Sequence, residues 1–560
     1  MSYRRLATMT AATAAAVSVA LVPGLAFAAA PHTAGSAAKA LPATATPEVG
    51  FAAASNARTF SSPAAKSVRL HSASGRSSAA TPQTVDPDLA VAVEATNTTG
   101  YGVALDVNVT SASGVALTAT YDWGDGTTPE TATLDGPGEL QPKHEYKKLG
   151  TYTIDVTVTD NQGDTVSNGL TFVTLGSDYT AYGPTRLLDT RAGTGAAKAK
   201  VAAHGTVHLQ VGGHGTIPAG ATAAVLNVTV TDAVAPGFIT AYDHGDTRPA
   251  TSNVNFVKGQ TVPNQVIVPI GANGQVDLYN GSSGTVDLIA DIAGYFTQSA
   301  SSGYTPLAPY RIVDTRNGTG APKKQLAGKA SVAAQVAGND KGKLPTSGIT
   351  AVALNVTVTG SLSSGFLTVY PDGKALPTAS NVNFTKGQTI ANSVIAPVGS
   401  DGKIRIYNGS GKAASVIVDV VGYYSAGSKS VYVPLPPTRF LDTRAANGGG
   451  PLPSDEYIPL QISTDEPDIT GFALNTTVTS TKASGYLAVA PDPNTQQQYD
   501  DDTAKPLPLP SGSTLNWLRG QTVPNLVQAS TGNNGIIDFF NASKGSTNLI
   551  IDVFGFYGND

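Results

Sequence analysis

The sequence contains no cysteine among its 560 residues, so no disulfide bond can stabilise any part of the fold. Charged residues are also scarce, at 13%, and the formal net charge is −5. This charge lacks the basic excess that nucleic-acid binding needs, and we expect no nucleic-acid partner. After the N-terminal segment no apolar run is long enough to cross a membrane as a helix, so we expect no membrane insertion. Stability must come from hydrophobic cores, which domains of about 125 residues can form without cross-links.

Residues typical of turns are abundant, with 60 Gly and 36 Pro. Low charge together with many turn residues is typical of extracellular modules rich in β-structure.

Residues 1–28 have the features of a secretion signal. Arg4 and Arg5 precede an uncharged run rich in Ala, Val and Leu, and Ala26-Phe27-Ala28 has the small-x-small pattern that signal peptidase recognises. A membrane anchor is the alternative, but the run is rich in Ala and Thr and Pro23 interrupts it. We therefore expect an extracellular, secreted protein, held to the cell wall without a covalent anchor if it is attached at all. Residues 29–85 show no apolar periodicity and are predicted to be a disordered linker of Ala, Ser, Thr and Pro.

Three copies of one unit make up the remainder of the chain after residue 176. The hexapeptide Arg-Leu-Leu-Asp-Thr-Arg at 186–191 returns, with apolar exchanges, at 311–316 and 439–444. In each copy the same segments follow in the same order, and the last ends in Asp-x-x-Gly-aromatic. Such self-similarity indicates tandem repeats, which we place at 177–299, 300–429 and 430–560. We expect each copy to close a hydrophobic interior of its own.

The pattern within each copy predicts an all-β fold. Short runs alternate apolar and polar residues, and Asn280-Gly281 and Asn408-Gly409 are strong hairpin signals. A β-sandwich or jelly roll is expected for each repeat. A β-trefoil has a suitable size, but it would show sub-repeats of about 40 residues, which we do not find. The third copy differs by an insertion between Pro491 and Ser513, which we expect to be a surface loop.

Residues 86–176 also alternate and predict a separate β-sandwich. The segment from Tyr121 to Thr127 reads Tyr-Asp-Trp-Gly-Asp-Gly-Thr, and His-Glu-Tyr, Gly-Thr-Tyr and Asp-Asn-Gln-Gly follow in that order. This set of motifs resembles the PKD (polycystic kidney disease-type) domain, and the resemblance implies an Ig-like sandwich that serves as a spacer or auxiliary binding module. Asp122 and Asp125 could contact calcium, but two carboxylates fall short of the 6–8 oxygens that calcium prefers. We expect the Asp of this tight turn to bond backbone N–H groups instead.

The three-copy unit resembles the Arg-Leu-Leu-Asp-Thr-Arg repeat modules of secreted actinobacterial proteins, in which similar units accompany cell-wall amidases and peptidases. That resemblance implies association with the cell wall or its polysaccharides.

The Asp and the second Arg of each hexapeptide are the candidate binding residues. They could form hydrogen bonds to sugar hydroxyls or peptide carboxylates, since Arg offers a planar donor fork. The alternative, which we favour, is an internal ion pair, for instance Arg191 with Asp189 or Asp291, that fastens the first strand to the last. The asparagines of the first copy have the same two interpretations, and we favour turn and backbone hydrogen bonds over contact with a ligand. The candidate residues are Asp189, Arg191, Asp314, Arg316, Asp442 and Arg444, with Asn227, Asn253, Asn255 and Asn264 beside them.

Catalytic motifs are missing from the sequence: there is no thiol, no Gly-x-Ser-x-Gly segment and no phosphate-binding loop. The histidines of the first copy (His204, His208, His214 and His244) do not recur in the other copies and have no recognised ligand spacing, so we expect no metal and no cofactor.

The sequence therefore predicts a secreted, non-catalytic multi-module protein that binds cell-wall or other extracellular polysaccharide through its repeated β modules. A structural or adhesive scaffold is the first alternative. A wall-active hydrolase is the second, because two carboxylates can converge from anywhere in a fold. Tyr279, Tyr407 and Phe540 could be platforms for sugar rings or parts of the cores. The sequence leaves the ligand and the oligomeric state open.

Overall fold

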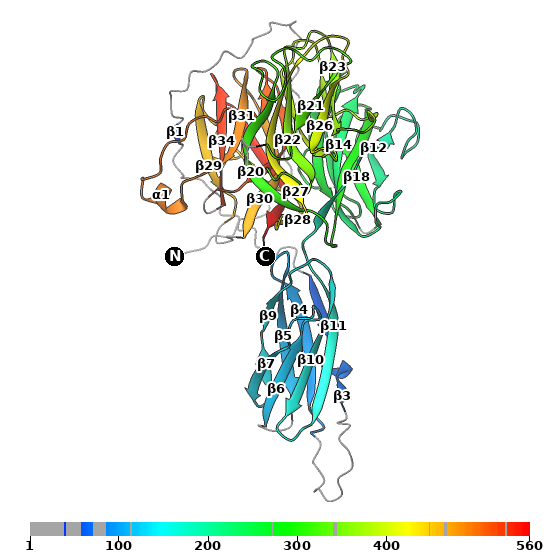
Figure 1. Cartoon of the computed structure of the whole chain (residues 1–560), viewed down its shortest axis with the longest axis vertical. Helices are drawn as coiled ribbons and strands as arrows, with labels where there is room; N and C mark the ends of the chain where they lie inside the picture. Colours follow the sequence, from blue (N-terminus) through cyan, green and yellow to red (C-terminus); the bar gives the residue numbers. More distant parts are fainter. Residues whose placement is uncertain are drawn as a thin grey trace, which may run out of the picture.

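The computed structural model describes residues 39–40, 58–70, 86–111, 115–271, 273–339, 344–446, 448–463, 468–532 and 535–559. The regular secondary structure of these residues is almost entirely β-strand, which confirms the all-β prediction, and the strands form sandwiches of antiparallel sheets (Figure 1). The described part of the chain contains no helix that is long and apolar enough to span a membrane. The predicted secretion signal and most of the predicted linker lie outside the described residues.

The PKD-like region is a sandwich of two sheets, drawn in blue to cyan in Figure 1. Its core consists of alternate apolar residues from both sheets around Trp123 and Phe172. One sheet has the order β3 (Val68–Leu70), β11 (Thr165–Val173), β10 (Thr151–Asp160), β6 (Ala116–Asp122) and β7 (Glu130–Asp135). The other has the order β2 (Thr59–Ser62), β4 (Ala90–Asn97), β5 (Gly102–Thr110) and β8 (Gly138–Leu140), and β9 (Lys143–Glu145) also pairs with β5.

Part of the predicted linker belongs to this sandwich. Strands β2 and β3, joined by a 3-10 turn at Ala64–Lys66, form one edge of each sheet by pairing with β4 and β11. The prediction of a disordered segment over 29–85 was therefore wrong for residues 58–70. The reason is that an edge strand gains its stability from backbone pairing with its neighbour, which a search for apolar periodicity does not detect.

Each repeat is a sandwich of an inner and an outer four-stranded sheet. In repeat 1 the inner sheet is β12 (Asp178–Asp189), β19 (Asp287–Thr297), β14 (Ala221–Thr231) and β17 (Val262–Pro269), and the outer sheet is β13 (Thr206–Gln210), β18 (Gln275–Asn280), β15 (Gly237–Asp243) and β16 (Val254–Phe256). Repeat 2 has the inner sheet β20 (Gly303–Asp314), β27 (Ser415–Ser425), β22 (Ile349–Thr359) and β25 (Ile390–Pro397), and the outer sheet β21 (Ser331–Gln335), β26 (Lys403–Asn408), β23 (Gly365–Pro371) and β24 (Val382–Phe384).

Repeat 3 has the same strand order. Its inner sheet is β28 (Val431–Asp442), β35 (Asn548–Gly558), β30 (Ile469–Thr479) and β33 (Val523–Ser530), and its outer sheet is β29 (Glu456–Gln461), β34 (Ile536–Ser543), β31 (Gly485–Pro491) and β32 (Leu515–Trp517). A two-residue strand, β1 (Lys39–Ala40), pairs in parallel with β29. The insertion after β31 contains a short helix, α1 (Gln496–Asp500), which begins with a capping box at Thr495.

The three inner sheets pack against one another. Leu226 and Val228 of β14 face the core of their own repeat, whereas Ala223 and Val225 on the opposite face belong to a cluster shared by all three repeats. That shared cluster includes a group of buried aromatic rings: Tyr179, Phe296, Tyr304, Tyr424, Tyr432 and Tyr557. Each copy therefore has an interior of its own, as expected, and the copies also share a second core. We call this three-repeat body, residues 177–559, the head.

Backbone bridges close the head into a ring at the end next to the PKD-like sandwich. Tyr179 of repeat 1 bridges to Ser302, Tyr304 of repeat 2 to Ser430, and Tyr432 of repeat 3 to Ser177. The first residues of β12, β20 and β28 therefore meet at the junction from which the PKD-like sandwich extends (Figure 1), and we call this the near end. The strands run away from it, so that Asp189, Asp314 and Asp442, their last residues, lie at the far end of the head.

Candidate functional site

The recurring hexapeptide forms an ion-pair network inside each repeat. In repeat 1, the Arg186 Nε donates to Asp291 on β19 at 2.9 Å, and one terminal nitrogen of Arg186 donates to Asp189 at 3.1 Å. Arg191 donates to both oxygens of Asp189, at 2.9 and 2.8 Å. The favoured internal ion pair thus forms between Arg191 and Asp189. The first strand is fastened to the last by Arg186 instead, the first residue of the hexapeptide, which the prediction had not named.

The Asp-Thr-Arg triplet forms a turn at the end of the first strand of each repeat. Asp189 ends β12, and its side chain accepts the backbone N–H of Arg191 at 3.1 Å, as in an Asx-turn. The same turn forms at Asp314 and Asp442. The three aspartate side chains are 7%, 1% and 17% exposed, and their arginine partners Arg191, Arg316 and Arg444 are 44%, 43% and 48% exposed. Only the arginine of each pair is therefore accessible to a ligand.

The buried charges have shifted pKa values. Burial raises the pKa of Asp291, Asp419 and Asp552, although the arginine facing each one favours the charged form. Hydrogen bonds from Arg191 lower the pKa of Asp189, against the effect of burial. These are the opposing effects expected of a desolvated ion pair. Removing one partner of such a pair leaves an uncompensated buried charge, so the network behaves as an internal fastening.

The same network reaches across to the next repeat. Arg186 donates to the carbonyl of Thr378 in repeat 2, Arg311 to that of Ser511 in repeat 3, and Arg439 to that of Ala250 in repeat 1. The same arginine of each repeat thus contributes one hydrogen bond to each of the three interfaces in the ring. Head-to-tail interfaces of this kind produce either a closed ring or an open-ended array, and here three repeats close the ring.

Buried asparagines form a further hydrogen bond at each interface, with the donor on the repeat that accepts the arginine. Asn264 donates to Asn475 at 2.9 Å, Asn392 to Asn227 at 3.0 Å, and Asn525 to Asn355 at 3.1 Å. The side-chain oxygens of Asn264, Asn392 and Asn525 also accept backbone N–H groups from the neighbouring repeat. Asn227 and Asn264 donate to backbone carbonyls, as the sequence reasoning favoured. They also hold the repeats together, a role that this reasoning missed because the partner side chains lie 165 and 211 residues away.

The recurring aromatic residues of the outer sheets point away from the sandwich cores. Tyr279 and Tyr407 are absent from the interiors of their repeats and are partly exposed. Arg248 lies 3.9 Å from the centre of the Tyr279 ring, a cation–π contact. Phe540 is buried, but it is covered from outside by Tyr457 and the insertion of repeat 3.

The far end of the head is strongly basic. Four loops of each repeat meet there: 190–205, 232–236, 257–261 and 281–286 in repeat 1, and their equivalents in repeats 2 and 3. The described residues of the far-end loops include 14 exposed Lys and Arg residues and two exposed acidic residues, Asp232 and Asp455. The basic residues are Arg191, Lys198, Lys200, Lys258, Arg316, Lys323, Lys324, Lys329, Lys386, Lys412, Arg444, Lys482, Arg519 and Lys544.

The charge of the PKD-like sandwich is opposite. Residues 84–174 contain 13 carboxylate side chains and only three lysines. The molecule is therefore acidic at the sandwich and basic at the far end of the head, although its overall charge is only −5. The far-end loops also expose aliphatic side chains beside their cations: Val234, Val257, Leu362 and Leu518 are each about half exposed, at 52%, 58%, 49% and 56%.

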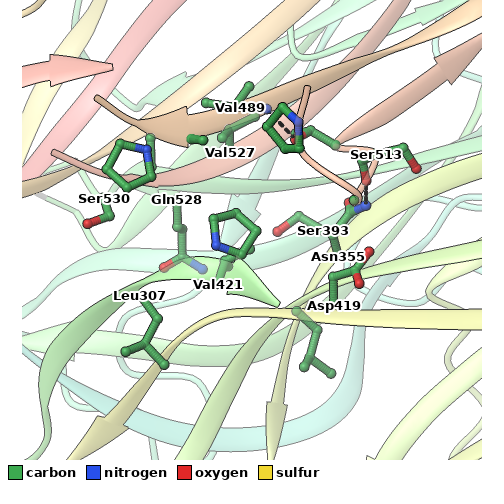
Figure 2. Close-up of a pocket in the computed structure, with 18 of the residues that line it drawn as sticks. Leu307, Asn355, Ser393, Asp419, Val421, Val489, Ser513, Val527, Gln528 and Ser530 are labelled. Atoms are coloured by element: carbon green, nitrogen blue, oxygen red, sulfur yellow. Dashed lines mark hydrogen bonds between the residues drawn. The ribbon is translucent and has the colours of Figure 1, made fainter. Parts of the chain in front are cut away.

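A narrow cleft lies between repeats 2 and 3 (Figure 2). Leu307 and Val421 of repeat 2 face Val489 and Val527 of repeat 3 across it, and Asp419 lies at its edge. Its lining residues include no aromatic side chain on which a sugar ring could stack, and its one carboxylate is already paired with Arg311. The cleft is thus an apolar recess of the repeat interface.

The tight turn of the PKD-like sandwich is held by its aspartates, as predicted. Asp122 accepts the backbone N–H of Gly124 at 2.9 Å, and Asp125 accepts that of Thr127 at 3.0 Å. The second oxygen of Asp125 contacts His144 at 2.9 Å. Hydrogen bonds from Thr127 and His144 lower the pKa of Asp125 to about 2, against the desolvation that burial imposes.

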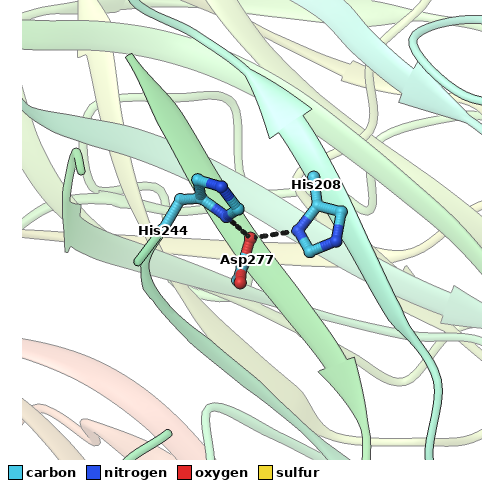
Figure 3. Close-up of side chains that lie close together, drawn as sticks. All are labelled: His208, His244 and Asp277. Carbon is cyan, nitrogen blue, oxygen red and sulfur yellow. Dashed lines mark hydrogen bonds and ion pairs between the residues drawn. The ribbon is translucent and has the colours of Figure 1, made fainter. Parts of the chain in front are cut away.

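Two of the four histidines of repeat 1 converge on one carboxylate. His208 and His244 both contact Asp277 on β18, and Figure 3 shows the two rings on either side of that carboxylate. His204 and His214 do not belong to this cluster. Sequence reasoning had dismissed all four histidines. His244 and His208 lie 33 and 69 residues before Asp277 in the sequence, a spacing that matches no short metal-binding motif.

Comparison with known protein families supports the interpretation of the first domain. The family model of the PKD domain matches residues 84–174, in agreement with the expected range of 86–176. The match covers none of the three repeats, and no curated protein matches the chain. A PKD domain joined to a multi-sheet all-β head is an architecture that fits a surface or adhesive module.

Proposed function

We propose that the protein is a secreted, non-catalytic surface module that attaches to anionic cell-wall or other extracellular polysaccharide through the far end of its head. The PKD domain then acts as the acidic spacer on the opposite side. The observation that carries this proposal is the concentration of cations in the far-end loops of all three repeats. A face of one charge attracts a polymer of the other charge and orients the molecule during approach.

The closed ring supports the same function. Because the repeats are related by the ring, their equivalent loops lie at the same height, so three basic loop sets face one surface together. A rigid arrangement lets several weak contacts act at once without ordering a flexible linker, which raises avidity. The pair of Arg186 with Asp291, its equivalents and the buried asparagines hold the head together, so the ligand contacts fall to the loops and not to a separate site inside each repeat.

The exposed halves of Arg191, Arg316 and Arg444 are part of this surface. Each guanidinium is oriented by its buried aspartate and can still offer free donors to an anionic group. The candidate arginines thus contribute to binding in the proposal, whereas their aspartates serve to position them.

A scaffold or adhesive protein without a defined ligand is the second candidate. It is favoured by the shared core and the three equivalent polar interfaces, which make the head one rigid body of fixed shape. Under this hypothesis the basic face keeps molecules apart or orients them and has no polymer partner.

Co-sedimentation of the purified chain with insoluble anionic and neutral polysaccharides separates the two candidates. We expect retention on the anionic polymer that falls steeply with salt, because exposed charges are screened within about 10 Å at 0.1 M ionic strength. The triple variant Lys323→Glu, Lys324→Glu, Lys386→Glu reverses charge at the far end and should lose most of the retention.

The matched control reverses three exposed lysines of the PKD domain, Lys143→Glu, Lys147→Glu and Lys148→Glu, with the same change in net charge. Equal losses in both variants would show that only overall charge matters, and no retention of the unmodified chain would favour the scaffold. Preferential binding to anionic lipid vesicles would assign the face to a membrane surface instead. Release of soluble fragments from cell-wall material by the full chain would contradict the non-catalytic assignment.

A further inference from the structure

A cluster on the outer face of repeat 1 has the composition of a metal site. His208 projects from β13, Asp277 from β18, and His244 from the turn directly after β15. The Nδ1 atoms of His208 and His244 lie 2.6 and 2.9 Å from the same carboxylate oxygen of Asp277 (Figure 3). One ligand atom from each of the three residues falls within 4.8 Å of the other two.

We propose that this cluster binds a divalent transition-metal cation such as Zn²⁺, with His208, His244 and Asp277 as its ligands. Two imidazole nitrogens and one carboxylate oxygen form a donor set that suits zinc, copper, nickel or cobalt better than calcium or magnesium. Three protein ligands leave a coordination position for water, as in open zinc sites. The ion would bind the two Nδ1 atoms and the carboxylate oxygen in place of the hydrogen bonds that now join them.

The surroundings of the cluster favour a cation. Asp243, the last residue of β15, lies beside Asp246 and close to Asp277. Two further carboxylates therefore lie close to the cluster, and the nearby Arg248 is engaged with the Tyr279 ring. A divalent ion would relieve this crowding of negative charge.

The same position in repeat 2 contains a cation supplied by the protein. The strand registers place Ala333 opposite Arg405 where repeat 1 has His208 opposite Asp277. Asp372 occupies the position of His244. The backbone N–H of His244 donates to Gln275, two residues before Asp277, and that of Asp372 donates to Lys403, two residues before Arg405. Arg405 donates to Asp372 at 2.7 Å, so an ion pair fills the position.

Repeat 3 fills this position with two carboxylates, Asp538 and Asp492, opposite Pro459. The outer sheet of each repeat thus carries charged or metal-binding side chains at the same position, where two paired strands meet the turn after a third strand. Repeat 2 fills this place with an arginine and an aspartate, repeat 3 with two carboxylates, and repeat 1 has the donors for a metal ion.

A bound metal would stabilise a particular part of the head. His244 begins the segment 244–253 between β15 and β16, and this segment contacts repeat 3. The carbonyl of Ala250 accepts Arg439, and that of Ser252 accepts Asn475. Fixing His244 to the outer sheet therefore restrains the segment that forms one of the three interfaces of the ring.

The test is calorimetric titration of Zn²⁺ into the full chain, produced without a histidine tag and treated with a chelator. We expect one saturable site per chain, together with a nitrogen-ligated spectrum when Co²⁺ is used as the probe. His208→Ala and His244→Ala should each weaken binding by about tenfold or more, a loss comparable to that from removing outer partners of metal ligands. His214→Ala is the control, because His214 is exposed and lies outside the cluster.

A second variant keeps the proposal independent of folding defects. The double substitution His244→Asp, Asp277→Arg copies the ion pair of repeat 2 and should abolish zinc binding while the chain melts at the temperature of the metal-free protein. The absence of saturable Zn²⁺ and Co²⁺ binding by the unmodified chain would overturn the proposal. Binding that survives in both the double variant and His208→Ala would overturn it as well.

Discussion

Asp538 offers the sharpest test of the electrostatics of the head. Its side chain is fully buried on β34, and among the described residues no donor reaches either of its oxygens. Its neighbour Asp492 already accepts the Tyr499 hydroxyl and the backbone N–H of Asn494. Desolvation, followed by repulsion from Asp492, raises the pKa of Asp538 from 3.8 to about 9. At neutral pH the folded protein therefore holds a proton on Asp538 that the unfolded chain releases.

The direction of the pH effect follows from this difference in protonation. A group with a raised folded-state pKa contributes stability that is fully present below its unfolded pKa and is lost as the pH rises toward the folded pKa. Between about pH 4 and pH 9 the free energy of unfolding should fall by about 1.4 kcal/mol per pH unit on account of Asp538. At pH 7 the accumulated cost is about 4 kcal/mol relative to a neutral side chain at this position.

The substitution Asp538→Asn keeps the shape and a donor toward Asp492 but removes the titration. We expect the variant to be more stable than the unmodified protein at pH 7, and about equal to it near pH 4. For a cooperative unit of about 400 residues the gain corresponds to roughly 5 °C in melting temperature. Differential scanning calorimetry of both chains at pH 5 and pH 7.5 measures it, with the exposed Asp501→Asn as control.

A variant that melts below the unmodified protein at pH 7.5 would refute the reasoning, because it would mean that the fold uses a charged Asp538. Equal differences at both pH values would show that the pKa of Asp538 is not raised.

Two further substitutions test the fold. Gly124→Ala should destabilise the PKD domain by about 2–3 kcal/mol, because Gly124 has a φ of +74° and an added Cβ would lie 2.2 Å from the Thr153 carbonyl oxygen. Chemical denaturation followed by Trp fluorescence measures this loss, and an unchanged midpoint would contradict it. Asn525→Ala should lower the free energy of unfolding by roughly 2–5 kcal/mol, since it leaves the Asn355 side-chain oxygen and the Ser393 N–H buried without their partner. A melting temperature equal to that of the unmodified chain would show that this interface does not stabilise the head.

Much of the fold could be predicted from the sequence because its signals are local. Alternating residues such as Ile154, Val156 and Val158 identify a strand with one buried face. The recurrence of the hexapeptide and of the segments that follow it defines the repeats, since one sequence pattern packs in one way each time. The turn at Asp122 and Asp125 was also predictable, because its hydrogen bonds join residues two positions apart.

One sequence signal of the ring was present but was not used. The inner strands are apolar on both faces, as in β14, where Ala223 and Val225 alternate with Ala224 and Leu226. A strand of this kind must be covered on both sides. The pattern was consistent with a partner for the inner sheets, although it could not identify the other two repeats as that partner.

The sequence by itself determined the strands, the sandwich class, the number of repeats and the residue types available for ion pairs, because these depend on spacing along the chain. Only the tertiary structure decided that the repeats close into a ring, that Arg186 and not Arg191 meets Asp291, and that His208, His244 and Asp277 converge. The physical reason is the same in each case. Such contacts join residues up to 262 positions apart, and their formation depends on how whole sheets pack once their apolar faces are buried.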